Sequence, residues 1–79
     1  MGKQVPVGAT WSGMSKGNKY HSSVPIKIWL DERRGELEIW KWQIQNSTLP
    51  INQNWGTSYA NCRSQLRNLG IDCEMKRVN

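Results

Sequence analysis

The sequence predicts a small α+β domain in which one helix packs on a three-stranded antiparallel sheet, in the order β-β-α-β. Three observations predict this fold. Apolar and polar residues alternate from residue 24 onward, which is strand spacing. Residues 56–71 combine a polar cap, an apolar stripe and a terminal glycine, which together indicate a helix. A second alternating run follows the helix. With 79 residues, the chain is expected to form one domain.

Residues 1–23 are rich in glycine, serine and lysine. This composition predicts a flexible basic arm ahead of an α+β domain that spans residues 24–79, with a short strand near Val5–Val7. Lys16 and Lys19 would then be free to contact phosphate groups. An arm without any binding role is an equally good interpretation.

The clearest strand signal begins at residue 24. Apolar side chains recur there at every second position, in Val24, Ile26, Ile28 and Leu30. The polar run 31–35 ends in a glycine and predicts a hairpin loop, and residues 36–45 form the return strand. A four-residue loop would place Ile28 opposite Leu37, whereas a five-residue loop would place Trp42 beside Val24. The pattern leaves both registers open, and its change of phase near 39–40 predicts a β-bulge.

A helix is predicted from Thr57 or Ser58, either of which can cap it, to the left-handed terminator Gly70. Its expected buried stripe is Tyr59, Cys62, Leu66 and Leu69. A single helical turn is predicted at Pro50–Trp55. The last strand is expected over residues 71–75, beside the hairpin, and the two cysteines are expected to be small buried residues.

The opposite side of this helix is polar. Its side chains are of the types that contact base edges and phosphates: Asn61, Arg63, Ser64, Gln65, Arg67 and Asn68. They predict a nucleic-acid-binding surface. The alternative is a solvated helix face without a ligand.

Within this segment the residues Gly56-Thr57-Ser58, Cys62, Leu66 and Gly70-Ile71 resemble the second half of a helix-turn-helix, and the end at 69–71 resembles the entry to the wing of winged-helix DNA-binding proteins. The resemblance implies that the helix enters the major groove of DNA. It covers residues 56–71 only. The preceding segment 49–55 departs from the family pattern because it is short and contains a proline.

Five tryptophans and no phenylalanine form an unusual aromatic set. Trp29, Trp40 and Trp42 alternate with lysine on the predicted hairpin, and such a surface could stack nucleic-acid bases. The favoured alternative is that these rings fill the core, because a small domain needs their apolar area.

A formal charge of +5 favours an anionic partner. We expect a nucleic-acid-binding accessory or regulatory protein, with DNA favoured over RNA. The alternative is a compact protein-binding module, such as a phage or mobile-element inhibitor that covers an acidic host surface. The hydrophobic content of 37% also makes a homodimer an option.

Several functions are not expected. No apolar run is long enough to cross a membrane, and no signal peptide is evident, so a cytoplasmic location is expected. Two cysteines and one histidine do not make a structural zinc site, so we expect no metal and no cofactor. No acid, histidine or serine spacing indicates a catalytic pair, and enzyme activity is not expected.

Overall fold

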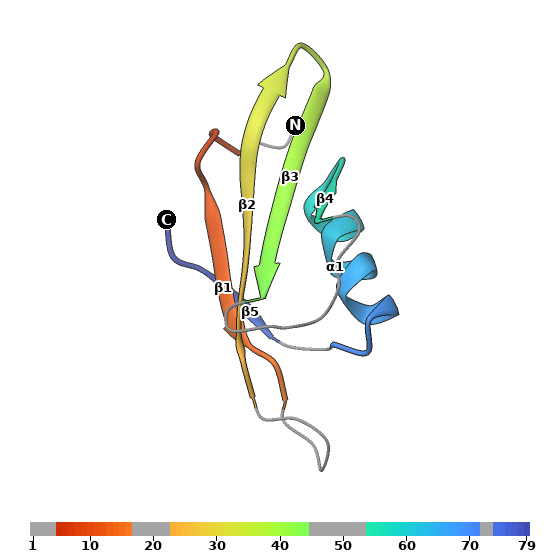
Figure 1. Ribbon diagram of the computed structural model, residues 1–79. Coiled ribbons are helices and arrows are strands. Elements are labelled where there is room, and N and C mark those ends of the chain that lie inside the picture. Colours follow the sequence, from red (N-terminus) through yellow and green to blue (C-terminus); the bar gives the residue numbers. More distant parts are fainter. Residues whose placement is uncertain (1–4, 17–22, 45–53, 72–73) are drawn as a thin grey trace.

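The computed structural model describes residues 5–16, 23–44, 54–71 and 74–79, and its ribbon is shown in Figure 1. The elements are β1 (Thr10–Met14), β2 (Pro25–Arg34), β3 (Leu37–Ile44), β4 (Trp55–Gly56), α1 (Tyr59–Asn68) and β5 (Met75–Arg77). The strands form one five-stranded sheet of order β4-β3-β2-β1-β5, and every pair of neighbours is antiparallel. A helix with a sheet agrees with the α+β class.

The predicted three-stranded sheet with a flexible N-terminal arm is wrong. Thr10–Met14, expected in the arm, forms β1 and lies between β2 and β5. β5 therefore pairs with β1 and not with the hairpin. The strand signal of β1 was weak because Gly13 occupies a position on the buried face, where an apolar side chain would have revealed the alternation. Val5–Val7 is not a strand.

The β2–β3 hairpin is longer than expected, and both predicted registers are wrong. Arg34 pairs with Leu37 across a two-residue turn, in which Gly35 has a φ of 60°. Positive φ at this position is typical of tight hairpin turns and costs glycine little. The predicted irregularity opposite Ile39 and Trp40 is present, and the extra residue is Asp31 on β2.

The helix is confirmed with its two ends. Ser58 is the N-cap, and its Oγ accepts a hydrogen bond from the Asn61 N–H at 3.0 Å. At the other end Gly70 has a φ of 81°, and the Ile71 N–H donates to the Leu66 carbonyl at 2.9 Å. This is the six-to-one bond of a Schellman motif. The predicted helical turn at 50–55 falls mostly outside the described residues, and its last residue belongs to β4.

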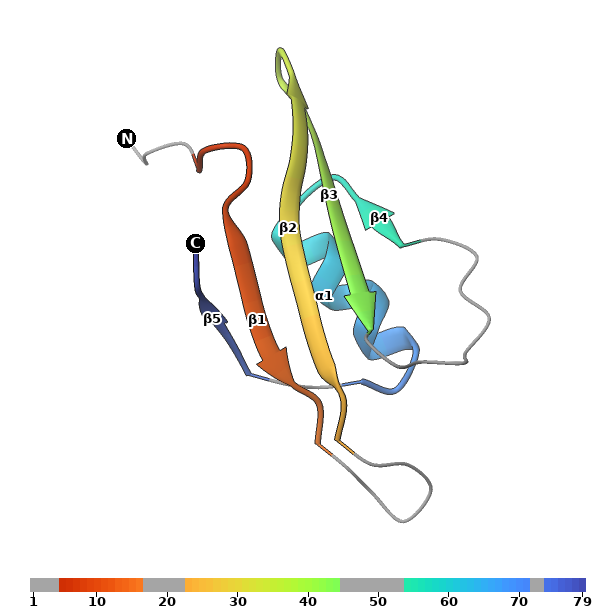
Figure 2. The ribbon, with the colours of Figure 1, turned by 60° about the vertical axis from the view of Figure 1, so that its left-hand side comes forward.

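The core lies between α1 and one face of the sheet. Its buried members are Ile26, Ile28, Leu30, Trp40, Trp42, Ile44, Cys62, Leu66 and Ile71. Partly buried Tyr59 packs against them, whereas Leu69, expected in the stripe, is 42% exposed. In Figure 2 the helix lies on one side of the sheet only. None of the described elements covers the other side of the sheet.

Candidate nucleic-acid interface

Two residues of the predicted helix surface, Asn61 and Gln65, bond within the protein. The Gln65 Oε1 accepts a hydrogen bond from the buried Trp42 indole at 2.8 Å, and its Nε2 donates to the Trp55 carbonyl at 2.8 Å. Asn61 accepts from the same Nε2 and from the Thr57 N–H. Gln65 therefore ties α1 to β3 and β4, and Asn61 supports it from the segment between β4 and α1.

Gly56 explains how the amides come so close to the sheet edge. A Cβ at this position would overlap the side chain of Asn61 and press on that of Gln65. The absence of a side chain therefore lets α1 and β4 approach each other. Sequence alone identified Gly56 as a turn residue and missed this packing role.

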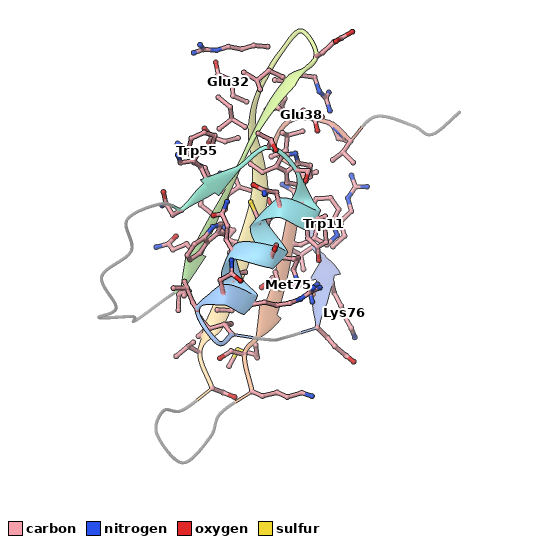
Figure 3. All side chains as sticks on the ribbon, turned by 90° about the vertical axis from the view of Figure 1, so that its right-hand side faces the viewer. Trp11, Glu32, Glu38, Trp55, Met75 and Lys76 are labelled. Atoms are coloured by element: carbon pink, nitrogen blue, oxygen red, sulfur yellow. The ribbon has the colours of Figure 1, made fainter. Side chains whose placement is uncertain are left out.

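Arg63 lies on a different flank of the helix. Its Nη1 donates to the Tyr59 hydroxyl at 3.0 Å, and its guanidinium lies 5.8 Å from the Tyr59 ring centroid. Tyr59 packs against Trp11 of β1 at 5.1 Å between ring centroids, and Arg77 of β5 lies over the other ring of this pair at 5.6 Å. Figure 3 shows Trp55 on one flank of α1, and Trp11 and Met75 on the other. The predicted helix surface is thus divided between two flanks.

The remaining members of the predicted surface are exposed: Ser64, Arg67 and Asn68 on α1, and Lys16 just after β1. Lys19 lies outside the described residues. Arg67 is the one cation among the three helix residues. A groove-binding role of this helix, as the helix-turn-helix resemblance implies, stays a prediction.

The three tryptophans proposed for stacking do not share one surface. Trp40 is 4% exposed and Trp42 is 1% exposed, so both rings belong to the core. Trp29 is partly buried, and its side chain projects to the other side of the sheet from those of Ile28 and Leu30, its neighbours on β2. Its cross-strand partner is Lys41, whose own partner on β4 is Trp55. Directly paired residues of a sheet project to the same face, so these three side chains form a row on the uncovered side.

A second row runs beside the first, two residues further along the strands. It consists of Gln43, Lys27, Ser12 and Lys76, paired in that order across β3, β2, β1 and β5. We call the two rows together the open face: Ser12, Lys27, Trp29, Lys41, Gln43, Trp55 and Lys76. Sequence reasoning missed Trp55, Lys41, Lys27 and Lys76 as one surface, because only the register joins them.

Asp31, the bulged residue, connects members of the aromatic row. Its Oδ1 accepts a hydrogen bond from the Trp29 indole at 3.2 Å, and its Oδ2 lies 3.2 Å from the Lys41 Nζ. The hydrogen bond from Trp29, followed by the contact with Lys41, lowers the pKa of the Asp31 carboxyl. The bulge thus turns a carboxylate toward the open face, where it orients one ring and one cation.

Charge is unevenly distributed along the sheet. At the hairpin end, where Glu32 and Glu38 lie in Figure 3, three glutamates accompany two arginines. Both arginines are paired, Arg33 with Glu38 at 2.6 Å and Arg34 with Glu32 at 2.7 Å. The open face carries three lysines, of which Lys41 is paired with Asp31. Among the described residues, neither Lys27 nor Lys76 forms a salt bridge, so these two cations are better placed for an anionic ligand than the arginines of the hairpin end.

No group of three histidine, cysteine or acidic side chains that could hold a metal ion occurs within the described ranges. Cys62 is fully buried, and burial raises the pKa of its thiol to about 11. A protonated, inaccessible thiol is a poor nucleophile and metal ligand.

Among the helices of the described segments, none has the length and apolar character needed to cross a membrane. Comparisons with models of protein families, with curated proteins and with solved structures give no match. The function is therefore inferred from the geometry and charge of this chain.

Proposed function

We propose that this protein binds nucleic acid and that the open face of its sheet is the contact surface. The observation that carries the proposal is the row Trp29–Lys41–Trp55 on the side of the sheet opposite α1. Aromatic rings and cations together suit nucleic acid, because bases stack on the rings and phosphates pair with the cations. Lys27 and Lys76 in the neighbouring row add two more cations.

The state of the side chains on α1 supports this choice over the helix. Gln65 donates to the Trp55 carbonyl of β4, Asn61 accepts from the Thr57 N–H just after β4, and Arg63 donates to the Tyr59 hydroxyl. Base reading by the first two would require these internal bonds to break. The exposed remainder of the helix surface offers one cation, Arg67, whereas the open face offers the exposed Lys27 and Lys76, with Lys41 paired to Asp31 between the rings.

The proposal predicts salt-dependent affinity, because each phosphate contact releases counterions. Binding of labelled 20-nucleotide single strands and duplexes should be measured by fluorescence anisotropy at 50 and 200 mM salt. The double variant Lys27→Gln/Lys76→Gln should bind more weakly and with a smaller salt slope. The matched control Lys16→Gln/Arg67→Gln removes the same charge from the end of β1 and from the helix, and should bind as wild type.

The outcome of this comparison decides between surfaces and tests the function itself. If only the control variant loses affinity, the helix surface and the segment around Lys16 form the contact, as predicted from the sequence. If neither single strands nor duplexes bind wild-type protein at 50 mM salt, the proposed function is wrong. Nucleic acid is present in the cytoplasm, so the ligand is compatible with the expected location.

A protein partner is the second candidate function. Leu37 is 52% exposed and Trp55 is 46% exposed. Leu37 has the same parity on β3 as Lys41, and Trp55 is paired with Lys41, so both side chains lie on the side of the sheet opposite α1. Exposed aromatic residues are frequent hot spots of protein interfaces. An acidic protein surface would also match the lysines. Recovery of a stoichiometric protein from nuclease-treated lysate, with no oligonucleotide binding, would favour this candidate. A dimeric mass in solution would identify a second copy as the partner.

A further inference from the structure

We infer that the ligand is a single strand, with one base stacked on Trp29 and another on Trp55. This inference rests on the proposed nucleic-acid function and specifies the form of the ligand. Its first support is the exposure of the rings. Trp55 is 46% exposed and Trp29 is partly exposed. A position one residue along either strand would have turned the ring to the side that α1 covers. Duplex DNA keeps its bases stacked on one another, whereas a single strand can offer them to protein rings.

The width of the sheet is the second support. Neighbouring strands lie about 4.8 Å apart, so five strands span about 19 Å. The major groove of DNA is about 12 Å wide and admits a helix or a two-stranded ribbon. A five-stranded face is too wide to enter it flat. The hairpin end is narrow enough, but its arginines are paired with glutamates there, which makes it a poor match for phosphates.

The third support is that the aromatic row is already held in position. Asp31 accepts the Trp29 indole N–H and contacts Lys41, while the Trp55 backbone is fixed by Gln65. A ring that is oriented before binding loses less conformational freedom when a base stacks on it. Lys27 lies 6.0 Å from the Trp29 ring centroid and is exposed, so it can move from the ring to a phosphate.

The two rows also suit the two parts of a nucleotide. They are separated by two residues along each strand, which corresponds to about 6–7 Å. Bases would lie on the Trp29–Trp55 row, and the sugar-phosphate backbone would follow the row that contains Lys27 and Lys76. The two rings are separated by two strand spacings, about 10 Å, so each ring takes its own base and Lys41 lies between them.

The test compares three 20-nucleotide ligands of one sequence: single-stranded DNA, single-stranded RNA and duplex DNA. Affinities are measured for wild type, Trp29→Ala, Trp55→Ala and the control Leu37→Ala, which truncates an exposed apolar residue at the hairpin end. Each tryptophan variant should lose about tenfold or more in single-strand affinity, with an unchanged salt slope. Trp29→Phe should recover part of the loss, because phenylalanine keeps a stacking ring. Circular dichroism confirms that each variant is folded.

The inference is supported if either single strand binds more tightly than the duplex and the tryptophan variants show these losses. The more tightly bound single strand then shows whether the protein prefers DNA or RNA. Equal or tighter duplex binding, or tryptophan variants that bind single strands as wild type does, overturns the inference. Either of these results leaves nucleic-acid binding itself standing, because that function is refuted only when no ligand binds. Failure of all three ligands to bind would instead refute the function. The two results are therefore distinguishable.

Discussion

Gln65 offers the sharpest test of how the helix is attached to the sheet. Replacing it with methionine keeps the length of the side chain and removes its bonds to Trp42, Trp55 and Asn61. Trp42 is 1% exposed, so its indole N–H would lose its 2.8 Å partner in a place that water does not reach. A buried donor left without a partner costs about 1–3 kcal/mol.

The other two contacts are exposed, and water can replace them at little cost. We therefore expect Gln65→Met to lower the free energy of unfolding by about 2 kcal/mol, dominated by the indole. For a domain of this size that corresponds to a fall in melting temperature of roughly 8–16 °C. Urea denaturation followed by tryptophan fluorescence measures the first quantity, and calorimetry measures the second.

A double-mutant cycle with Trp42→Phe isolates the bond. Phenylalanine has no donor, so Gln65→Met should cost about 1 kcal/mol less in that background than in wild type. Arg67→Met, on the exposed side of the same helix, is the control and should stay within about 0.5 kcal/mol of wild type. An equal cost in both backgrounds would refute the reasoning.

Three further predictions concern other parts of the fold. The hydrogen bond from Arg33, and then that from Trp40, lowers the pKa of Glu38 below its ordinary value of 4.5. The ionised Glu38 carboxylate therefore stabilises the fold above pH 4.5, and this stabilisation is lost as the pH falls through the pKa of Glu38 in the folded protein. The urea midpoint should therefore drop more between pH 7 and pH 3 in wild type than in Glu38→Gln, and equal drops would contradict the assignment. Gly13→Ala should destabilise the protein by about 1–3 kcal/mol, since its Cβ would overlap the Glu74 carbonyl and displace β5; an unchanged melting temperature would show that the strand accommodates it. With the other cysteine replaced by serine, the buried Cys62 thiol should react with a disulfide reagent at pH 8 only as fast as the protein opens, and fast reaction in native conditions would contradict its burial.

The helix was predictable because its determinants are local. The Ser58 side chain caps the helix by accepting a hydrogen bond from the N–H of Asn61, three residues further along the chain. At the other end, Gly70 and Ile71 complete the Schellman motif within a few residues of the last helical turn. Such signals are readable in a few consecutive residues. The positions of Cys62 and Leu66 in the core follow from the same periodicity.

The sheet was less predictable because its determinants are not local. The two-residue turn lies at residues 35–36, further along the chain than predicted, and Asp31 then adds one residue to β2, so Ile28 meets Trp42, whereas the same turn without the bulge would place Ile28 opposite Gln43. A shift of one residue moves each side chain to the other face. The tryptophans show the result: Trp40 and Trp42 belong to the core, while Trp29 shares the outer surface with Lys41.

The candidate site was partly predictable by residue type and poorly by position. Aromatic rings between lysines were identified on the hairpin, and Trp29 retains that description. Lys76 could not be assigned to the same surface, because it joins Ser12 through a pairing between strands more than sixty positions apart. Asn61 and Gln65 have the chemistry of base-reading residues, but Gly56 lets them approach the strand edge instead.

The arrangement of strand lengths has a consequence for how the protein behaves at high concentration. The longest strand, β2, is paired on both sides, whereas the outermost strands, β4 and β5, have two and three residues. Short edge strands give an approaching chain few free backbone groups to pair with, and charged side chains discourage such pairing further. β5 carries Lys76 and Arg77. Strand addition at β4 or β5 therefore offers an approaching chain little backbone pairing, even though several large apolar side chains face solvent.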